Sequence, residues 1–299
     1  MSVTTPSGLR IWVTAARLRT LPAALAPVLV GTALAGYLHV FHPLRFLAAL
    51  LGAIFIQVGT NLSNDYSDAR RGADAEDRLG PVRVTAGGLV PPKRVLIATY
   101  VSFGLAVLAG IYLMVVAGWQ LLLVGAASIL AGVLYTGGPR PYGYEGLGEV
   151  FVFLFFGIVA VAGSFFVQVK HLDWEAFALA VPVGLLAAAI LVVNNVRDID
   201  TDRRAGKRTL AVRLGRGRTR TLFASIVYGA YLLTPVAWLF GPLKPLVLLP
   251  WLTLALAAQV VRVVRNSTDG PSLNETLART GLLQLTFCIL LSAGLLLSR

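Results

Sequence analysis

Nine runs of mostly apolar residues follow one another along the chain, each close to 20 residues long. An α-helix needs about 20 apolar residues to cross the hydrocarbon core of a bilayer. Only 13% of the 299 residues are charged, whereas soluble domains have about a quarter. The sequence therefore predicts an all-α, polytopic membrane protein with nine transmembrane helices around a central chamber. The predicted spans are residues 20–40, 44–62, 95–117, 119–136, 147–168, 174–194, 221–240, 243–262 and 280–297.

Arginine and lysine residues are distributed unequally over the loops between these spans. If the loops alternate across the membrane, 22 of the 26 basic residues lie on the side of the N-terminus. Because basic residues accumulate in cytoplasmic loops, we predict a cytoplasmic N-terminus and a C-terminus outside. Basic loops also account for the net charge of +12, so no nucleic-acid partner is expected. We expect residues 1–299 to form one transmembrane domain.

Two polar motifs continue directly from predicted spans two and six. The first, "NLSNDYSDARRGAD", covers residues 61–74, and the second, "NNVRDIDTDRRAGKR", covers residues 194–208. Each has an Asn four residues before an Asp, a second Asp three or four residues later, and then two arginines. Residues three or four apart share one face of a helix, so each motif presents an amide and two carboxylates as a stripe. Asp200, two residues from Asp198 and from Asp202, is expected to point away from that face.

The mixture of charges in these motifs indicates the kind of ligand. Carboxylates next to a membrane interior are costly and are functional candidates by default. Two facing pairs of carboxylates repel each other unless a cation lies between them, and oxygen-only ligand sets favour hard ions such as Mg²⁺. Arginines and lysines interleaved with the acids would neutralise a polyanion that the metal also bridges. This pattern favours a metal-bound diphosphate over a pathway for cations.

The paired motifs, on a chain of nine spans, resemble the UbiA superfamily of intramembrane prenyltransferases. The first motif of that superfamily is written N-D-x-x-D-x-x-x-D. Asn64, Asp65 and Asp68 match it, whereas Gly72 occupies the last position and Asp74 follows two residues later. With Gly72 at this position, the motif resembles that of the menaquinone branch of the superfamily. Three further stretches resemble that branch: "DRLGPVRVTAGGLV" (77–90), "YTGGPRPYGYEGLGEVFVFLFFG" (135–157) and "NNVRDIDTDRRAGKRTLAVRLG" (194–215).

The resemblance implies Mg²⁺-dependent transfer of a polyprenyl group from polyprenyl diphosphate to 1,4-dihydroxy-2-naphthoate, with loss of CO₂. It implies that Asp65, Asp68, Asp198 and Asp202 bind Mg²⁺, with Asp74 as an outer ligand, and that Lys207 stabilises the leaving diphosphate. The polyprenyl tail would lie in membrane lipid and the diphosphate at the cytoplasmic rim of a bacterial plasma membrane. The other residues expected to contact the substrates are Asn61, Asn64, Arg78, Arg83, Arg140, Tyr144, Glu149, Asn194 and Arg208.

Two loops are expected to serve this site. Residues 135–150 contain five glycines and two prolines, which excludes a regular helix and suits a loop that faces the substrates. The long loop 63–94 suits a lid over bound diphosphate.

Two other functions stay open. The acceptor could instead be 4-hydroxybenzoate, a porphyrin-like ring or a glycerol phosphate ether. A cation-coupled secondary transporter is the alternative of a different class. The paired arginines and the lack of acids deeper inside the spans count against a transporter.

Overall fold

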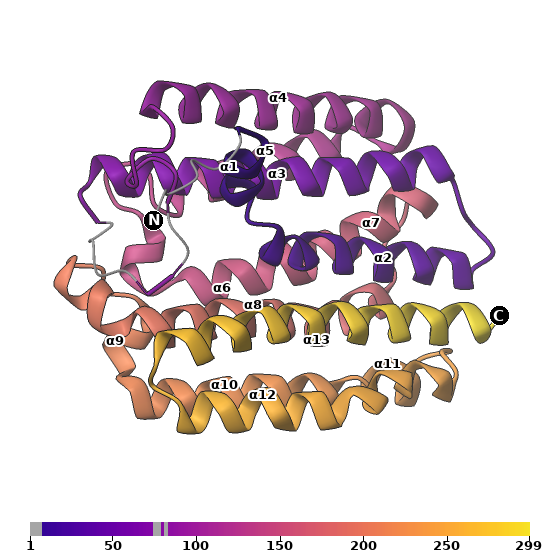
Figure 1. Ribbon diagram of the computed structural model, residues 1–299. Coiled ribbons are helices and arrows are strands. Elements are labelled where there is room, and N and C mark those ends of the chain that lie inside the picture. The colour runs from indigo at the N-terminus through magenta and orange to yellow at the C-terminus, as the bar shows by residue number, and fades with distance from the viewer. Residues whose placement is uncertain (1–7, 74–78, 81–82) are drawn as a thin grey trace.

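The computed structural model describes residues 8–73, 79–80 and 83–299, and all the regular structure in that part of the chain is helical (Figure 1). Within these residues, eight helical stretches are long and apolar enough to cross a membrane. Four of them are single helices: α3 Pro43–Arg70, α4 Pro92–Ala117, α8 Trp174–Arg204 and α13 Gly270–Leu297. The other four combine shorter helices: Gly8–Tyr37 (α1 Gly8–Ala16, η1 Leu18–Thr20, α2 Leu21–Tyr37), Gly148–Val169 (α6 Gly148–Val152, η3 Phe153–Val159, α7 Ala160–Val169), Arg216–Leu239 (α10 Arg216–Leu233, α11 Val236–Leu239) and Pro245–Asn266 (η4 Pro245–Thr253, α12 Leu254–Asn266).

A shorter apolar helix, α5 (Gln120–Leu134), corresponds to the predicted span 119–136. Its 15 residues extend about 22 Å, which is less than the roughly 30 Å of a bilayer core. The all-helical, multi-pass architecture is thus confirmed, whereas the count of nine spans and the orientation of the termini stay predictions. Two further short helices, η2 (Tyr142–Glu145) and α9 (Leu210–Leu214), lie in connections.

Helices α3 and α8 continue past the predicted ends of their spans, at residues 62 and 194, to Arg70 and Arg204. Both motifs are therefore helical, as the stripe of amides and carboxylates requires. Helix α3 ends because Gly72 adopts a left-handed conformation, with a φ of 63°. The amides of Gly72 and Ala73 then donate to the carbonyls of Ala69 and Asp68, at 3.2 and 3.0 Å.

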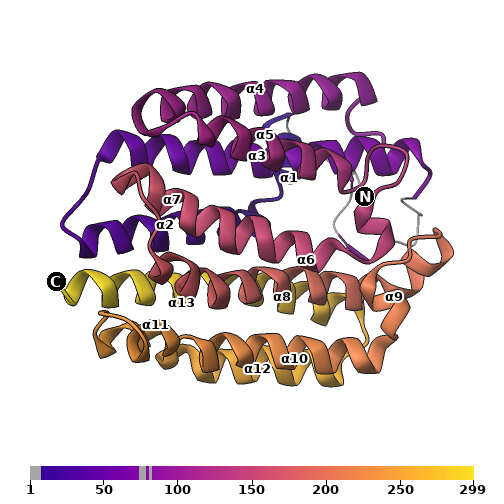
Figure 2. The ribbon, with the colours of Figure 1, turned by 180° about the vertical axis from the view of Figure 1, so that it is seen from behind.

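The long helices run side by side as an elongated bundle, seen from two sides in Figures 1 and 2. Helix α3 packs against α4, α2 packs against α13 and α7, and α8 packs against α10, α13 and η3. The motif-bearing ends of α3 and α8 lie at the same end of the bundle, near α9. The C-terminal end of α13 lies at the other end (Figures 1 and 2). Segments 133 residues apart in sequence therefore meet at one end of the fold.

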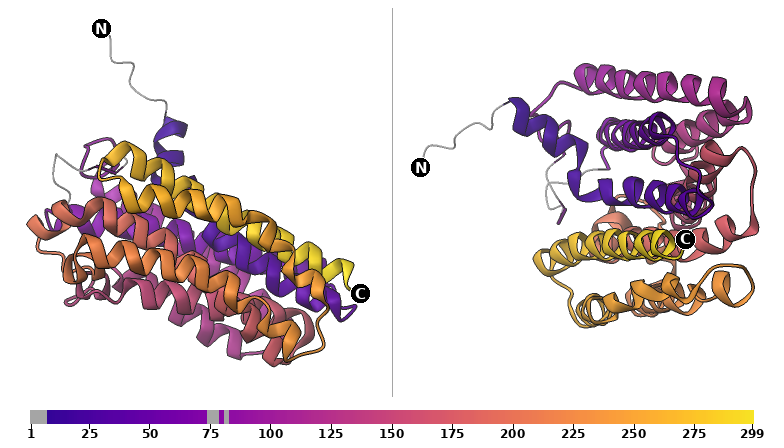
Figure 3. Two further views of the ribbon diagram at one scale, coloured as in Figure 1. Left: turned by 90° about the horizontal axis from the view of Figure 1, so that it is seen from below. Right: turned by 90° about the vertical axis from the view of Figure 1, so that its right-hand side faces the viewer.

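Helices α8 and η3 approach each other unusually closely. A Cβ on Gly157 would lie 2.5 Å from the Cα of Gly184, so both positions have room only for glycine. The η3 segment is a π-helical stretch, a conformation that is frequent at functional sites. The right-hand view in Figure 3, which looks along the bundle, shows the helices stacked in layers.

Large apolar side chains are exposed on the outer helices. On α4, for example, the exposed fractions of Tyr100, Leu108 and Val115 are 66%, 63% and 74%. Contiguous exposed apolar surface of this extent is unfavourable in water and suits contact with lipid. The packing of the described helices therefore agrees with a membrane protein.

Candidate active site

A cavity of about 380 Å³ lies between the helices, a size typical of small-molecule sites. Helices α2, α3, α4, α5, α7 and α8 and the loop after α5 contribute to its wall. Small and apolar side chains line most of it. The polar end, at the motif-bearing ends of α3 and α8, is lined by Asn61, Asn64, Asp68, Arg83, Tyr144, Asn194, Asn195, Asp198, Asp202 and Lys207.

Asp68 is the centre of this polar end. Its carboxylate is 1% exposed and accepts three hydrogen bonds from side chains that lie far apart in the sequence. Tyr144 Oη donates to Oδ1 at 2.7 Å, and Arg83 Nη2 and Lys207 Nζ each donate to Oδ2 at 3.1 Å. Such charge-assisted hydrogen bonds are roughly twice as strong as neutral ones. Two buried cations are thereby held at the cavity, where they can receive a phosphate group.

The ring of Tyr144 contacts Lys207 and a further cation, Arg71. Lys207 Nζ lies 4.9 Å and the guanidinium carbon of Arg71 lies 5.8 Å from the ring centroid, within the range of a cation–π interaction. Arg71 also donates to the carbonyl of Gly138, and the backbone amide of Arg208 donates to the carbonyl of Tyr144 at 3.0 Å. The loop after α5 is therefore tied to both motifs.

Tyr142, a residue of the same loop, anchors the loop to α5 and α6. Its ring stacks on that of Phe151 with centroids 3.9 Å apart, and its hydroxyl donates to the carbonyl of Ala131 at 2.9 Å. Burial raises the pKa of the Tyr142 phenol, so the hydroxyl stays protonated and keeps donating at neutral pH.

Asp198 is paired with its own neighbour in the chain. Arg197 Nε and Nη2 donate to Asp198 Oδ1 and Oδ2 at 2.7 and 2.5 Å, and the arginine side chain is 2% exposed. The same guanidinium donates to Asn194 Oδ1 at 2.8 Å and to Asn274 Oδ1, on α13, at 2.6 Å. Sequence reasoning missed Arg197 and Asn274. An arginine inside the second motif and an asparagine just before the last apolar run were the available signals.

Asp65 has a different environment. Its Oδ2 and Oδ1 accept the backbone amides of Val84 and Thr85, both at 3.0 Å, and the residue is 2% exposed. Of the four carboxylates predicted to bind metal directly, Asp68, Asp198 and Asp202 line the cavity among the described residues, and Asp65 lies behind its wall. Asp65 therefore holds the segment that carries Arg83 to Asp68.

The polar end of the cavity has oxygen ligands suited to a divalent cation. Among residues 8–73, 79–80 and 83–299, no three Asp, Glu, His or Cys side chains lie close enough to form a metal cluster by themselves. Three carboxylates and four asparagine amides nevertheless line the same end of one cavity. Mg²⁺ prefers oxygen ligands and commonly keeps waters and substrate phosphates, so it needs few protein carboxylates. These residues fit such an ion once a diphosphate is bound beside them.

Several predicted residues lie away from this group. Arg140 and Arg208 are exposed and do not line the cavity among the described residues. Glu149 is 7% exposed and accepts a hydrogen bond from Asn195 Nδ2 at 2.8 Å, outside the cavity wall. Asp200 pairs with Arg216 at 2.8 Å and points away from the motif face, as predicted. Asp74 and Arg78 lie outside the described residues.

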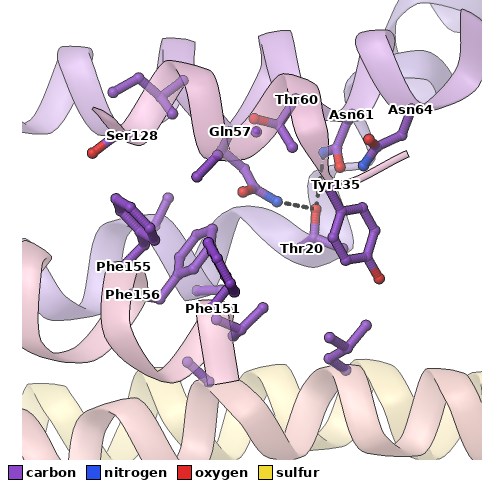
Figure 4. Close-up of a pocket in the computed structure, with 18 of the residues that line it drawn as sticks. Thr20, Gln57, Thr60, Asn61, Asn64, Ser128, Tyr135, Phe151, Phe155 and Phe156 are labelled. Atoms are coloured by element: carbon purple, nitrogen blue, oxygen red, sulfur yellow. Dashed lines mark hydrogen bonds between the residues drawn. The ribbon is translucent and has the colours of Figure 1, made fainter. Parts of the chain in front are cut away.

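A second polar group lines the cavity deeper in the bundle, between the polar end and the apolar end. Gln57 and Asn61 on α3 meet Thr20 of η1, and Tyr135 lies nearby (Figure 4). Gln57 belongs to the polar stripe of α3, whereas Thr20 and Tyr135 were not predicted. Isolated polar residues at helix ends give no sequence signal that distinguishes them from ordinary helix termini.

A family model described as the UbiA prenyltransferase family matches residues 24–293. The chain belongs to this family. The predicted resemblance is therefore confirmed, and it extends over nearly the whole chain.

Among its UbiA-family relatives, the chain is 44% identical to the 1,4-dihydroxy-2-naphthoate octaprenyltransferase of Mycobacterium tuberculosis, with 95% of this chain and 96% of the relative covered. It is 38% identical to the protein of the same name from Escherichia coli, with 96% of each covered.

Two solved structures share the UbiA fold. A UbiA homolog from Archaeoglobus fulgidus bound to DMAPP and Mg²⁺ has a TM-score of 0.70 at 14% identity, with 96% of this chain and 99% of that chain covered. A UbiA homolog from Aeropyrum pernix K1 has a TM-score of 0.71 at 15% identity, with 94% and 98% covered. At sequence identities this low, the likeness shows a shared fold alone.

Proposed function

We propose that this UbiA-family protein transfers a polyprenyl group from polyprenyl diphosphate to 1,4-dihydroxy-2-naphthoate, with loss of CO₂, in menaquinone synthesis. The observation that carries the proposal is the convergence of Arg83, Lys207 and Tyr144 on Asp68 at the mouth of an apolar cavity. The 44% identity to a 1,4-dihydroxy-2-naphthoate octaprenyltransferase, over nearly the full length of both chains, supports the choice of acceptor.

The polar end of the cavity binds the diphosphate. Asp68, Asp198 and Asp202, with the amide oxygens of Asn64 and Asn194, would hold Mg²⁺ beside it. Bound Mg²⁺ supplies positive charge that stabilises the developing negative charge on the leaving diphosphate. Asp65 and Asp74, the other two predicted ligands, are not needed for this arrangement.

The chain's own cations assist departure of the leaving group. Arg83 and Lys207 are buried beside Asp68, so they are desolvated and oriented before the substrate arrives. Preorganised charges of this kind stabilise a transition state without reorganising during the reaction. The hydroxyl of Tyr144 fixes the carboxylate that both cations contact.

The apolar remainder of the cavity separates the reacting carbon from water. Loss of diphosphate leaves an allylic cation, which water would otherwise capture. The wall includes Phe151, Phe155 and Phe156 around the space where the aromatic acceptor would attack. The attacked ring carbon forms the new carbon–carbon bond and then loses its carboxylate as CO₂, so aromaticity is restored.

The location of the site follows from its two substrates. We propose one transmembrane domain in a bacterial plasma membrane, with the motif-bearing ends of α3 and α8 on the cytoplasmic side and the C-terminus outside. The distribution of basic residues supports this orientation. The polyprenyl tail lies in the apolar cavity and in lipid, and its soluble partner enters from the cytoplasm.

The function is tested in membranes that contain the protein, incubated with labelled polyprenyl diphosphate and either 1,4-dihydroxy-2-naphthoate or 4-hydroxybenzoate. We expect a prenylated naphthoquinol that forms with Mg²⁺ and is absent with EDTA. Transfer only to the benzoate would rule out the naphthoate as acceptor. The absence of transfer to either ring would favour the transporter.

A further inference from the structure

Gln57 projects from α3 into the wall of the cavity, and half of its amide has no partner. The residue is 7% exposed, and its Nε2 donates to Thr20 Oγ1 at 3.0 Å. Its Oε1 is buried and has no hydrogen-bond donor among the described residues. Figure 4 shows this amide between the α3 ribbon and Thr20. A buried amide oxygen without a donor is unfavourable. Because Gln57 lines the cavity, a ligand bound there would supply the missing donor.

The hydrogen bonds around Thr20 fix the orientation of this amide. Thr20 Oγ1 donates its only proton to the carbonyl of Arg17 at 2.9 Å, so it must accept from its two other neighbours. Those neighbours are Gln57 Nε2 at 3.0 Å and Asn61 Nδ2 at 3.1 Å. A flipped Gln57 amide would place two acceptors against each other. The amide oxygen of Gln57 is therefore turned away from Thr20.

Asn61 is oriented in the same way. Its Nδ2 also donates to the carbonyl of Ala16 at 3.0 Å, so both of its N–H groups are used by the η1 segment. The amide nitrogens of Gln57 and Asn61 are thus turned towards Thr20 and its neighbouring backbone. Gln57, Asn61 and Thr20, here called the amide wall, leave the amide oxygens of Gln57 and Asn61 as hydrogen-bond acceptors beside the cavity that both residues line.

The amide wall lies where an aromatic acceptor would sit. Gln57 and Asn64 are seven residues apart on α3, which is about 10 Å along the helix axis. The wall is therefore close to the diphosphate end of the cavity and nearer to the membrane interior. Phe151, Phe155 and Phe156 line the same space across from it (Figure 4). A planar ring fits between an aromatic face and a polar edge of this kind.

We propose that the amide wall recognises a free ring hydroxyl of the aromatic acceptor and so admits the hydroquinone form and rejects the quinone form. This inference rests on the proposed function. A hydroxyl donates a proton to Gln57 or Asn61, whereas the carbonyl oxygen of a quinone can only accept and would face another acceptor. Only the hydroquinone ring is rich enough in electrons to attack an allylic cation, so the site selects the reactive redox state.

The chemistry of the acceptor indicates which hydroxyl is read. In 1,4-dihydroxy-2-naphthoate the 1-hydroxyl is adjacent to the carboxylate and donates to it within the molecule. The 4-hydroxyl has no internal partner, so it is the one available to the amide wall. Sites that hydrogen-bond a substrate hydroxyl discriminate strongly against analogues that lack it.

The experiment compares two ligands that differ only in that hydroxyl. The KM for 1,4-dihydroxy-2-naphthoate and the inhibition constant for 1-hydroxy-2-naphthoate are measured in wild type, in Gln57→Met and in Gln284→Met. Gln284 is the matched control because its amide is fully buried, has no hydrogen-bond partner among the described residues and lies outside the cavity wall.

In wild type and Gln284→Met we expect 1-hydroxy-2-naphthoate to bind about tenfold more weakly than the dihydroxy compound, the value of one good hydrogen bond. In Gln57→Met the ratio of the two constants should fall towards one, because only the dihydroxy compound loses affinity. The KM for polyprenyl diphosphate serves as the folding control and should stay within about twofold of wild type.

The outcomes distinguish a failure of the role proposed for Gln57 from a failure of the proposed function. An active wild type with the same ratio in all three proteins would show that Gln57 does not read the hydroxyl, while prenyl transfer to naphthoate would stand. A wild type without any prenyl transfer would overturn the proposed function itself. If Gln57→Met does not accumulate, Thr20→Val frees the amide and should reduce the ratio in the same direction.

Discussion

At the scale of single residues, the two aspartates of the first motif have different environments although they are three positions apart on α3. Asp68 faces the cavity and accepts side-chain donors from three other segments. Asp65 accepts two backbone amides from the segment after the first motif. Spacing on a helix predicts that both lie near one face, but it does not show which partners fold against them.

Replacing Asp68 should remove the centre of the proposed diphosphate site. In Asp68→Asn the side chain keeps its size and loses its charge, so Arg83 and Lys207 lose their shared carboxylate. We expect kcat to fall by about a hundredfold or more and the Mg²⁺ concentration for half-maximal activity to rise. Steady-state kinetics over a Mg²⁺ titration measure both. An unchanged Mg²⁺ requirement would remove Asp68 from the proposed ligands.

Replacing Asp65 should act through the backbone instead. In Asp65→Asn only the carboxamide oxygen can still accept, so one of the two hydrogen bonds from the backbone amides of Val84 and Thr85 is lost and the segment that positions Arg83 is held less tightly. We expect lower kcat, faster proteolysis of residues 79–90, and a Mg²⁺ requirement within about twofold of wild type. A Mg²⁺ requirement raised as much as in Asp68→Asn would instead support the direct metal ligation that the sequence predicted.

At the scale of elements, the two motifs owe their geometry to helices that continue beyond the lipid-spanning run. Gly72 and Gly206 adopt left-handed conformations just after α3 and α8, with φ of 63° and 73°. Each glycine ends its helix after the acidic stripe has been presented. In this chain α3 therefore stops just before Gly72, the position at which the superfamily motif has Asp.

This account predicts a cost for any side chain at Gly72. In the part of the chain that the structure describes, no atom lies within 4 Å of a Cβ built there, so the expected cost is conformational. Gly72→Ala should lower the free energy of unfolding by roughly 1 kcal/mol. Thermal unfolding in detergent should show a lower Tm, whereas Gly217→Ala, at an open helical glycine of α10, should not lower it. Equal Tm values for both variants would contradict the role given to Gly72.

The stability that the N-cap residue of α13 contributes depends on pH. The backbone amide of Ser272 donates to Asp269 Oδ1 at 2.8 Å and lowers the pKa of this exposed N-cap carboxyl. A folded-state pKa below the unfolded value gives stability that is present above the unfolded pKa and is lost as the pH falls through the folded pKa. Asp269→Ala should therefore lower Tm slightly at pH 7 and make no difference in strong acid. A Tm difference that persists in acid would contradict this.

At the scale of the whole molecule, the central cavity of the bundle has a charged end and an apolar end. Gly163 lines the apolar part, and no atom of the described residues lies within 4 Å of a Cβ built there. Gly163→Leu should therefore fill the cavity without disturbing the packing. We expect slower transfer from long polyprenyl diphosphates and little change with dimethylallyl diphosphate. Relative kcat/KM values for the two donors check this, and an equal loss for both would contradict it.

The sequence predicted the all-helical membrane architecture, the two motifs and most of the cavity's charged end, because apolar runs and helical spacing depend on local composition. It did not predict that Asp65 binds the backbone or that Arg197 pairs with Asp198. It placed Arg140 and Glu149 with the substrates, whereas the described structure has them outside the cavity wall. These outcomes depend on how distant segments dock, which no local pattern encodes.

Asn274, near the start of the last helix, has a consequence for the assembly of the protein during synthesis. Its side chain accepts from Arg197 at 2.6 Å and donates to the carbonyl of Leu79 at 2.7 Å, so it joins the two halves of the site. Both halves leave the ribosome long before α13 does. The nascent chain therefore carries an incomplete site until α13 inserts, so we expect catalytic competence to arise only after α13 has joined the bundle.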